Sequence, residues 1–306
     1  MKLSRTVRVG SRSSPLALAQ TEEILSLLKA RFADVRFDVV RLSTSGDRNA
    51  TAVLTSLGRG AFVKDIELAM LDGEIDIAVH SAKDVGPDIH DGLRILPVGE
   101  RQDARDVLVS KAGLSLMGLP AGSRLGTGSP RRKAQIKSIR PDVEVLPIRG
   151  NVGTRLEKAR GADYDGVVIA AAGLARLGRL SEATEFLDVE QVTPDVGQGT
   201  LVAEFRREDE EMDTILSSIV FEATASAFRA ERAFLDTIGG GCTAPVAAYG
   251  ETDGQRMRMF CMAATPDGER IVRSQMEGDV SEVEEIGRLA AKTLLESGAS
   301  EFVQGG

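Results

Sequence analysis

The sequence predicts two α/β domains with a cleft between them, followed by a small α+β domain. Strand-like and helix-like segments alternate over the first hundred residues, which is typical of a mostly parallel sheet covered by helices. The alternation then restarts and continues to about residue 171, without a repeat of the sequence itself. The last ninety residues differ, because their strand patterns follow one another before a final helix. A chain of 306 residues is long enough for two or three domains, each with its own core.

The first domain is expected to open with a short apolar strand at residues 6–10 and a helix that runs to about Arg31. Ser13 and Ser14 supply an N-cap for this helix, and Pro15 suits its first turn. The other elements expected in this domain are strands at residues 36–42, 75–80 and 93–99, and a helix at residues 62–71.

The second domain is expected to contain a helix that begins after Ser129. Its predicted strands are residues 107–110, 124–126, 143–148 and 166–171, and its predicted helices are residues 130–139 and 152–160. The third domain is predicted to have a helix at residues 222–235, strands at residues 246–251, 257–264 and 271–277, and a last helix to about Leu295. Ser281 and Glu284 have the spacing of a capping box for that last helix.

The domain boundaries follow from these elements. We expect residues 1–99 and 196–217 to form domain 1, residues 100–195 to form domain 2, and residues 218–306 to form domain 3. Hinges are expected near residues 99–105 and 193–199.

Charge is distributed unevenly along the chain. The whole chain has a net charge of −8, which argues against a general nucleic-acid or membrane binder. Residues 101–160, however, hold thirteen basic and five acidic residues, a net charge of +8, whereas the other 246 residues have a net charge of −16. A basic segment in an acidic protein indicates a local anionic ligand.

Several classes of protein are excluded by simple counts. No apolar run approaches the roughly 20 residues that span a bilayer, and the first residues lack the apolar core of a signal peptide. Two cysteines and two histidines form neither a disulfide framework nor a metal-ligand spacing. We therefore expect a cytoplasmic protein with no membrane segment and no metal.

The two cysteines occupy different surroundings. Cys261 lies in an alternating strand pattern and is expected to be a core residue. Cys242 follows three glycines and precedes Thr-Ala-Pro, so it is expected on a loop. It is either a thiol in a tight turn or a thiol presented for covalent attachment or nucleophilic chemistry. Because neither histidine is placed by sequence to act as its base, attachment is favoured over hydrolysis.

A polar segment, residues 80–85, leaves a buried strand at what should be its carboxyl end. Ligands of open α/β sheets bind at that edge. Asp84 beside Lys83 could act as an acid–base group or stabilise charge, or the two could form only a local ion pair in a solvated turn. His80, at the strand end, is expected to be structural.

Three strand-to-helix turns carry arginines next to small residues, namely residues 10–15, 126–132 and 149–155. Backbone N–H groups and the positive end of a helix attract carboxylates or phosphates, and arginines strengthen that attraction. These turns predict a cleft for an anionic ligand. A Walker lysine pattern and a complete G-x-G-x-x-G are both absent, so a nucleotide is not favoured. A fourth turn, residues 58–64, is either a lid whose Phe62 stacks on a planar ligand or simply the start of a helix core.

Together these segments resemble the porphobilinogen deaminase (hydroxymethylbilane synthase) family. The matching segments occur in the family's order over nearly the whole chain, and those containing His-Ser-x-Lys-Asp and Arg-Gly-Asn-Val-Gly-Thr-Arg are highly specific. They are residues 12–17, 62–64, 76–85, 126–132, 146–155, 196–199 and 231–232, with 240–242. The resemblance implies an α/β fold with two doubly wound, periplasmic-binding-protein-like domains around a cleft and a small α+β C-terminal domain.

The resemblance also implies the chemistry. A dipyrromethane cofactor would be bound to Cys242 through a thioether, and four porphobilinogen molecules would be joined head to tail on it with loss of ammonia. Asp84 would be the catalytic residue. The residues implied to bind the cofactor are Ser81, Lys83, Thr127, Ser129, Arg131 and Arg132. Those implied to bind the substrate or growing chain are Arg12, Ser14, Phe62, Arg149, Arg155, Arg176 and Gln198.

The sequence departs from the usual family pattern at a few positions. Gly128 and Pro130 stand where Ser and Leu are more usual, and Arg59, Gly239 and Ala244 also differ. None of these changes removes a charged group assigned to catalysis. The expected partner is the small-molecule substrate alone, without nucleic acid or membrane, bound by a monomer. The alternative class is a non-catalytic, two-lobed anion-binding protein, in which a domain carrying a thiol has no role.

Overall fold

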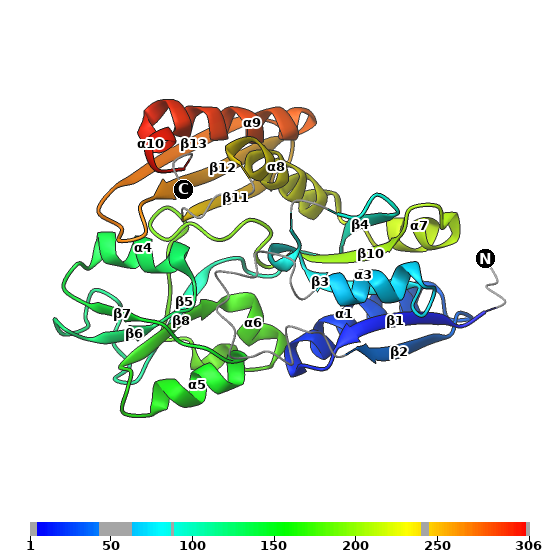
Figure 1. Cartoon of the computed structure of the whole chain (residues 1–306), viewed down its shortest axis with the longest axis horizontal. Coiled ribbons are helices and arrows are strands. Elements are labelled where there is room, and N and C mark those ends of the chain that lie inside the picture. The colour runs from blue at the N-terminus through cyan, green and yellow to red at the C-terminus, as the bar shows by residue number, and fades with distance from the viewer. Residues whose placement is uncertain (1–4, 43–62, 87–88, 240–244, 304–306) are drawn as a thin grey trace. The chain divides into compact units, whose positions relative to one another are not determined.

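The computed structural model describes residues 5–42, 63–86, 89–239 and 245–303 (Figure 1). The chain divides into two compact units. One comprises Met1–Arg101 and Thr200–Ala225, and the other comprises Gln102–Gly199 and Ser226–Gly306. The chain therefore passes between the units at residues 101–102, 199–200 and 225–226. Each unit is described separately below.

The first unit is built on a mostly parallel five-stranded sheet. Its strand order is β2 (Phe37–Leu42), β1 (Val7–Arg12), β3 (Ile77–Ser81), β10 (Leu201–Arg206) and β4 (Leu93–Val98). Strand β1 is parallel to both β2 and β3, whereas β10 runs antiparallel to both of its neighbours. The antiparallel strand is the one contributed by the chain returning to this unit.

Helices cover both faces of this sheet. Helices α1 (Pro15–Arg31) and α7 (Glu210–Ser217) pack with β1, β3 and β10 in one apolar cluster. Helix α3 (Lys64–Leu71) packs against the opposite face in a second cluster, because alternate strand residues such as Ala78 point that way. Ser14 caps α1, its Oγ accepting a hydrogen bond from the Ala17 N–H at 3.2 Å, which confirms the predicted helix start.

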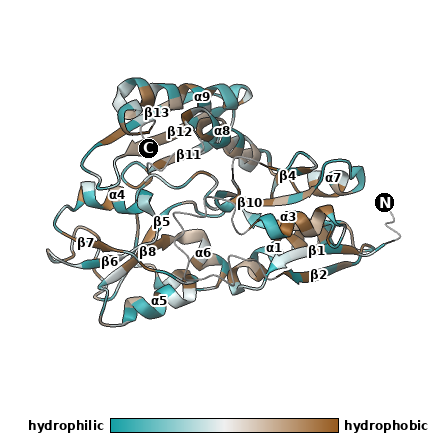
Figure 2. Cartoon of the chain, viewed as in Figure 1, coloured by the Kyte–Doolittle hydropathy of each residue, from teal (hydrophilic) through white to brown (hydrophobic). Residues whose placement is uncertain are grey.

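The second unit contains a sheet of the same kind. Its strand order is β7 (Glu144–Leu146), β6 (Arg124–Gly126), β8 (Gly166–Ala170), β5 (Asp106–Ser110) and β9 (Glu185–Phe186). Strands β6, β7 and β8 are parallel, and β5 is antiparallel to β8 and β9. Helix α4 (Pro130–Ile139) covers one face, while α5 (Val152–Arg160) and α6 (Ala171–Arg176) cover the other. The strongly apolar β8 is visible at the centre of this sheet in Figure 2.

A three-stranded antiparallel sheet completes the second unit. It consists of β11 (Val246–Asp253), β12 (Arg256–Ala264) and β13 (Ile271–Asp279). Helices α8 (Glu222–Ile238) and α9 (Val283–Leu294) pack on one of its faces. The other face meets α4, where Ala134 contacts Met262 and Ala247 within one apolar cluster.

The remaining elements are short. They are the single turns of 3₁₀ helix at Ala82–Asp84, Leu180–Glu182 and Val280–Glu282, the π-type turn at Leu295–Ala299 and α10 (Ser300–Val303).

The structure confirms the predicted α/β fold with a small α+β region, and most predicted elements lie within a few residues of the observed ones. Strands β9 and β10 and helices α6 and α7 were not predicted. The prediction of a capping box at Ser281 and Glu284 is wrong. The chain leaves β13 directly into a 3₁₀ turn, and the Asp279 carboxylate accepts hydrogen bonds from the Ser281 N–H and hydroxyl at 2.9 and 2.7 Å. Helix α9 therefore begins one residue later, after Glu282, which makes no side-chain cap.

The contact between α8 and α9 depends on Gly287. A Cβ atom at this buried position would lie 2.1 Å from the carbonyl oxygen of Ala230 in α8, so the two helices would have to separate. We expect Gly287→Ala to lower the free energy of unfolding by about 1–3 kcal/mol, measured by urea denaturation. Leu289→Ala, at an exposed position of the same helix, is the control and should change it by about 0.5 kcal/mol at most. A Gly287→Ala protein as stable as the control would contradict this packing.

Candidate active site

The first part of the candidate site is the turn between β6 and α4. Thr127 is buried, and its Oγ1 accepts a hydrogen bond from the Ser129 N–H at 3.2 Å. Ser129 caps α4, its Oγ lying 3.4 Å from the Arg132 nitrogen, and Pro130 occupies the first helical position. The turn thus presents the positive end of a ten-residue helix at the carboxyl edge of the sheet.

The side chains of Arg131 and Arg132 turn inward from this helix start. Only 4% and 5% of these residues are exposed, and both guanidinium groups meet the carboxylate of Asp106. Arg131 Nη1 lies 2.8 Å from Asp106 Oδ2, while Arg132 Nε and Nη2 lie 3.0 and 2.8 Å from Oδ1. Asp106 is fully buried and was not singled out from the sequence.

The electrostatics of this cluster favour an ionised Asp106. Burial by itself would raise the pKa of the Asp106 carboxyl. The charges of Arg131 and Arg132, and the hydrogen bonds from both guanidiniums, outweigh burial and hold that pKa well below its usual range. Two cations therefore share one anion in a buried site.

Neutral groups complete the coordination of the arginine pair. Arg131 Nη1 also donates to the Thr193 carbonyl at 2.6 Å, and Arg132 Nη1 to the Val168 carbonyl at 3.3 Å. Arg131 Nε is buried and has no hydrogen-bond partner among the residues that the structure describes. A buried donor without a partner is costly, so this nitrogen is a position where an added acceptor would be stabilising.

A second turn, between β7 and α5, lies beside the first. Asn151 caps α5 by accepting hydrogen bonds from the N–H and hydroxyl of Thr154 at 2.9 and 3.1 Å. Arg155 Nε donates to the Gly150 carbonyl at 2.8 Å. A Cβ atom on Gly128 would lie 3.9 Å from Arg155 Nη2, so the head of this arginine is next to the first turn. Arg149 is exposed at the start of the same turn.

Two predicted substrate residues have observed roles inside the protein. Gln198 is 1% exposed, and its Nε2 donates to the Ala104 carbonyl at 2.6 Å and to Asp106 Oδ1 at 2.7 Å. Its Oε1 accepts from Arg132 Nη2 at 3.3 Å. Arg176 Nη2 donates to the Gly199 carbonyl at 3.0 Å. A direct contact of either residue with substrate stays a prediction.

In the first unit, the predicted site residues lie at the ends of the parallel neighbours β1 and β3. Arg12 is half-buried at the end of β1, and Ser14 follows it as the cap of α1. At the end of β3 the Ser81 hydroxyl accepts a hydrogen bond from Gln20 Nε2 at 2.7 Å. The 3₁₀ turn that follows leaves Lys83 half-buried and Asp84 exposed. Sequence reasoning did not identify Gln20, a buried polar residue of α1 that holds Ser81 in place.

His80 is buried, with Nε2 3.0 Å from Glu204 Oε2, in agreement with its expected structural role. Cys261 is 2% exposed within β12, and burial raises the pKa of its thiol, so the prediction of a core residue is confirmed. Phe62 and Cys242, and with them the turns at residues 58–62 and 240–244, lie outside the described residues.

In the described part of the chain, no group of three histidine, cysteine or carboxylate side chains could hold a metal ion. None of the helices described is long and apolar enough to cross a membrane.

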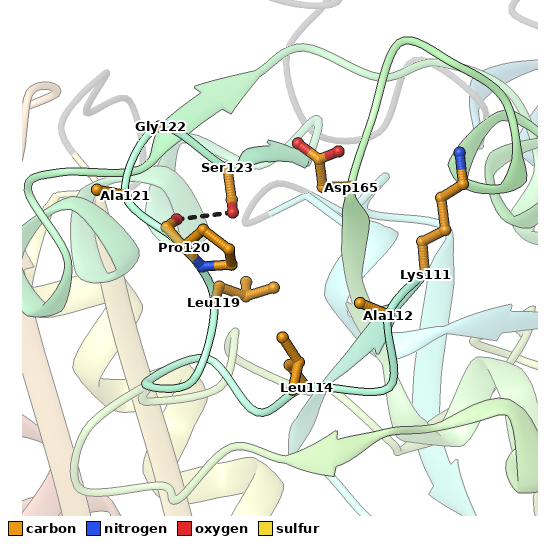
Figure 3. Close-up of a pocket in the computed structure, with 9 residues that line it drawn as sticks. All are labelled: Lys111, Ala112, Leu114, Leu119, Pro120, Ala121, Gly122, Ser123 and Asp165. Atoms are coloured by element: carbon orange, nitrogen blue, oxygen red, sulfur yellow. Dashed lines mark hydrogen bonds between the residues drawn. The ribbon is translucent and has the colours of Figure 1, made fainter.

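A pocket of about 560 Å³ lies at the opposite edge of the second sheet, where β6 and β8 begin (Figure 3). Its walls include Leu114, Leu119 and Pro120. Its polar groups are used internally, since Ser123 Oγ donates to the Pro120 carbonyl and Asp165 accepts from the Arg124 N–H. It does not include any of the predicted site residues.

The fold and these turns define an α/β protein with arginines at the starts of its helices, an arrangement suited to anionic ligands. Comparison with known proteins identifies the family. Residues 7–214 match the model "Porphobilinogen deaminase, dipyromethane cofactor binding domain", and residues 225–296 match "Porphobilinogen deaminase, C-terminal domain". The chain belongs to the porphobilinogen deaminase family.

Relatives with that name resemble the chain over its whole length. The porphobilinogen deaminase of Alkaliphilus metalliredigens is 42% identical over 98% of this chain and 95% of its own. That of Thermus thermophilus is 44% identical over 98% of both chains. Among solved structures, the Escherichia coli periplasmic aliphatic sulphonate binding protein SsuA is similar with a TM-score of 0.43 at 13% identity, covering 76% of this chain and 70% of its own.

The family, the transferase class, the place in tetrapyrrole biosynthesis and the dipyrromethane cofactor predicted from the sequence are thereby confirmed. The alternative of a non-catalytic anion-binding protein is not supported.

Proposed function

We propose that this chain is a hydroxymethylbilane synthase whose cofactor is attached to Cys242 and whose carboxylates are held chiefly by Arg131 and Arg132. In this reaction four porphobilinogen molecules are joined head to tail, each losing ammonia, and the tetrapyrrole is released by hydrolysis. The observation that carries the proposal is the buried pair of guanidinium groups sharing the single carboxylate of Asp106. That arrangement places two guanidinium groups in a site shielded from water, which suits an anionic ligand.

The donors at the α4 start fit the cofactor that the family uses. Each pyrrole carries an acetate and a propionate, and planar guanidinium groups bind carboxylates with two parallel hydrogen bonds. The donors here are the Ser129 hydroxyl, the N-terminal end of α4 and Arg131 Nε, which has no partner among the described residues. We propose that Thr127, Ser129, Arg131 and Arg132 hold the cofactor, together with Ser81 and Lys83. When bound, the dipyrromethane supplies the carbon at which the chain grows.

The remaining roles follow from the other turns. Asp84 is the proposed catalytic residue, because its carboxylate is exposed in the 3₁₀ turn that follows β3, where a carboxylate can serve as an acid–base group. The substrate and the growing chain bring further carboxylates, for which Arg12, Arg149, Arg155 and Arg176 are the proposed partners. Ser14, Phe62 and Gln198 complete the proposed substrate set.

We further propose three domains with the boundaries stated above, a monomer and a cytoplasmic location. The proposed partner is porphobilinogen, without nucleic acid or membrane. The charge distribution supports this choice, since the basic segment lies at the carboxylate-binding turns and the rest of the chain is acidic.

The test of the proposed function is the mass of the intact protein made in a host that produces porphobilinogen. We expect the wild-type chain to carry an adduct of two pyrrole units. Cys242→Ser should lose the adduct, because the thioether sulfur is gone. Cys261→Ser is the matched control and should keep it, since that thiol is buried in the core. A bare wild-type mass that persists after incubation with porphobilinogen would refute the proposal.

A further inference from the structure

Asp106 reaches the candidate site from an unusual direction. In an open parallel sheet, ligand-binding groups come from the carboxyl ends of strands. Asp106 is instead the first residue of β5, which runs antiparallel to β8, and it pairs with Ala170 at the carboxyl end of that strand. The reversed direction of β5 therefore places a carboxylate at the ligand edge of the sheet, directly behind the start of α4.

The buried carboxylate of Asp106 is bound by three side chains of the protein. Its two oxygens accept hydrogen bonds from Arg131, Arg132 and Gln198 at 2.7–3.0 Å. Gln198 also anchors to the Ala104 carbonyl, two residues before Asp106. The ionised carboxylate has no donor to offer a ligand carboxylate, so its contribution to binding must pass through the arginines.

The positive charges of Arg131 and Arg132 explain why a carboxylate between them is stabilising. Two guanidiniums buried side by side would repel each other and open the cluster, so one anion is needed to hold them. Asp106 is the carboxylate that both guanidinium groups contact, and the charge of Asp195 also acts on Arg131. Contact with Asp106 therefore keeps the two guanidinium groups together at the start of α4.

We infer that Asp106 is a positioning residue for the cofactor: it fixes the heads of Arg131 and Arg132 so that their remaining donors face the cofactor carboxylates. This inference rests on the proposed function, because it assumes that the arginine pair binds the cofactor. A purely structural role would predict that changes at Asp106 affect folding alone.

The experiment measures cofactor loading of the full chain made without porphobilinogen and then incubated with it. The readout is the porphobilinogen concentration that converts half of the chains to the adduct form in a fixed time, read by intact mass. Asp106→Glu retains the charge but displaces it by one methylene, and Asp106→Asn removes the charge. We expect this concentration to rise about 10- to 100-fold, as for other residues that orient ligand-binding groups, with the larger effect for Asp106→Asn.

Asp142 provides the matched control in the same sheet domain. Its carboxylate binds Arg140 Nε and Nη2 at 2.7 and 2.6 Å, away from the α4 start. Asp142→Asn should load like the wild type even if its melting temperature falls. Melting temperatures of all variants separate loss of fold from loss of loading.

Each outcome decides the inference. Folded Asp106 variants that load like the Asp142→Asn control would overturn it. If Asp106→Asn does not fold, Asp106→Glu decides alone, and if neither folds, the carboxylate is structural and the inference is rejected. A wild-type chain that never gains the adduct would instead refute the proposed function itself.

Discussion

Replacing Asp84 with alanine should lower the turnover of porphobilinogen by about 10²- to 10⁴-fold, the range supplied by a positioned acid or base. The side chain is exposed after β3, whereas the neighbouring Ala82 and Val85 are buried and hold the turn in place. The backbone is further held by the hydrogen bond from the Ala82 N–H to the Thr200 carbonyl at 3.0 Å. Loss of the carboxylate should therefore remove chemistry without removing structure.

The measurement is the initial rate of product formation by chains that carry the adduct, with circular dichroism as the check on folding. Asp72→Ala is the matched control, an exposed aspartate at the end of α3 in the same unit, and it should keep the wild-type rate. Turnover by Asp84→Ala close to that of the control would move the catalytic role to another residue.

The largest effect on stability is expected for Arg132→Leu. This change removes two hydrogen bonds and one charge from the buried Asp106 carboxylate. Each buried hydrogen bond to a charged group contributes about 1.5–3 kcal/mol, so losing two of them should cost about 3–5 kcal/mol even though Arg131 still neutralises the carboxylate. Urea denaturation should show a loss of this size, and the chain should fail to gain its adduct. A loss below about 1 kcal/mol would contradict the buried pairing.

Adding Asp106→Asn to Arg132→Leu tests the cause of that loss. The second change also removes the counter-charge of Arg131, but the Arg132–Asp106 hydrogen bonds are already lost, so the double variant should be less destabilised than the sum of the two single effects. Adduct formation should not return, since Arg132 is still missing. A double variant less stable by the sum of both single effects would show that the two groups do not interact.

The same cluster predicts how stability depends on pH. The pKa of Asp106 is lower in the folded chain than the value of about 3.9 expected in the unfolded chain. Its contribution is therefore fully present above the unfolded pKa and is lost as pH falls below it toward the folded pKa. Arg132→Leu removes one of the causes that lower this pKa, so acid unfolding of the variant should begin at a higher pH. Equal acid-unfolding midpoints would be evidence against that cause.

Local pattern was sufficient to predict most of the fold. The N-caps at Ser14 and Ser129 were predicted because capping depends on residues that are adjacent in sequence. Strand β10 was not predicted, although its residues are apolar, because its place in the first sheet depends on pairing with β3 and β4 more than a hundred residues earlier. The prediction of a capping box at Ser281 failed for a similar reason. The start of α9 depends on the path that the chain takes out of β13.

The candidate site likewise contains residues that the sequence predicts and residues that only the folded chain reveals. Asp84, Ser129, Arg131, Arg132 and Arg155 were selected because polar and basic residues follow predicted strands. Asp106 and Gln20 were missed because neither stands at the end of a parallel strand. Asp106 begins an antiparallel strand, and Gln20 lies within α1, so only the packed structure shows that they hold Arg131, Arg132 and Ser81.

The sequence by itself therefore determined the α/β class, the family and the location of the arginine-bearing turns, because each depends on short-range order along the chain. It also separated Cys261, which is buried, from Cys242, which remains the proposed attachment residue. Only the tertiary structure decided that Arg131 and Arg132 share one buried carboxylate and that Gln198 supports it. Those contacts join residues 25 to 92 positions apart, and the direction of β5 in its sheet is what brings them together.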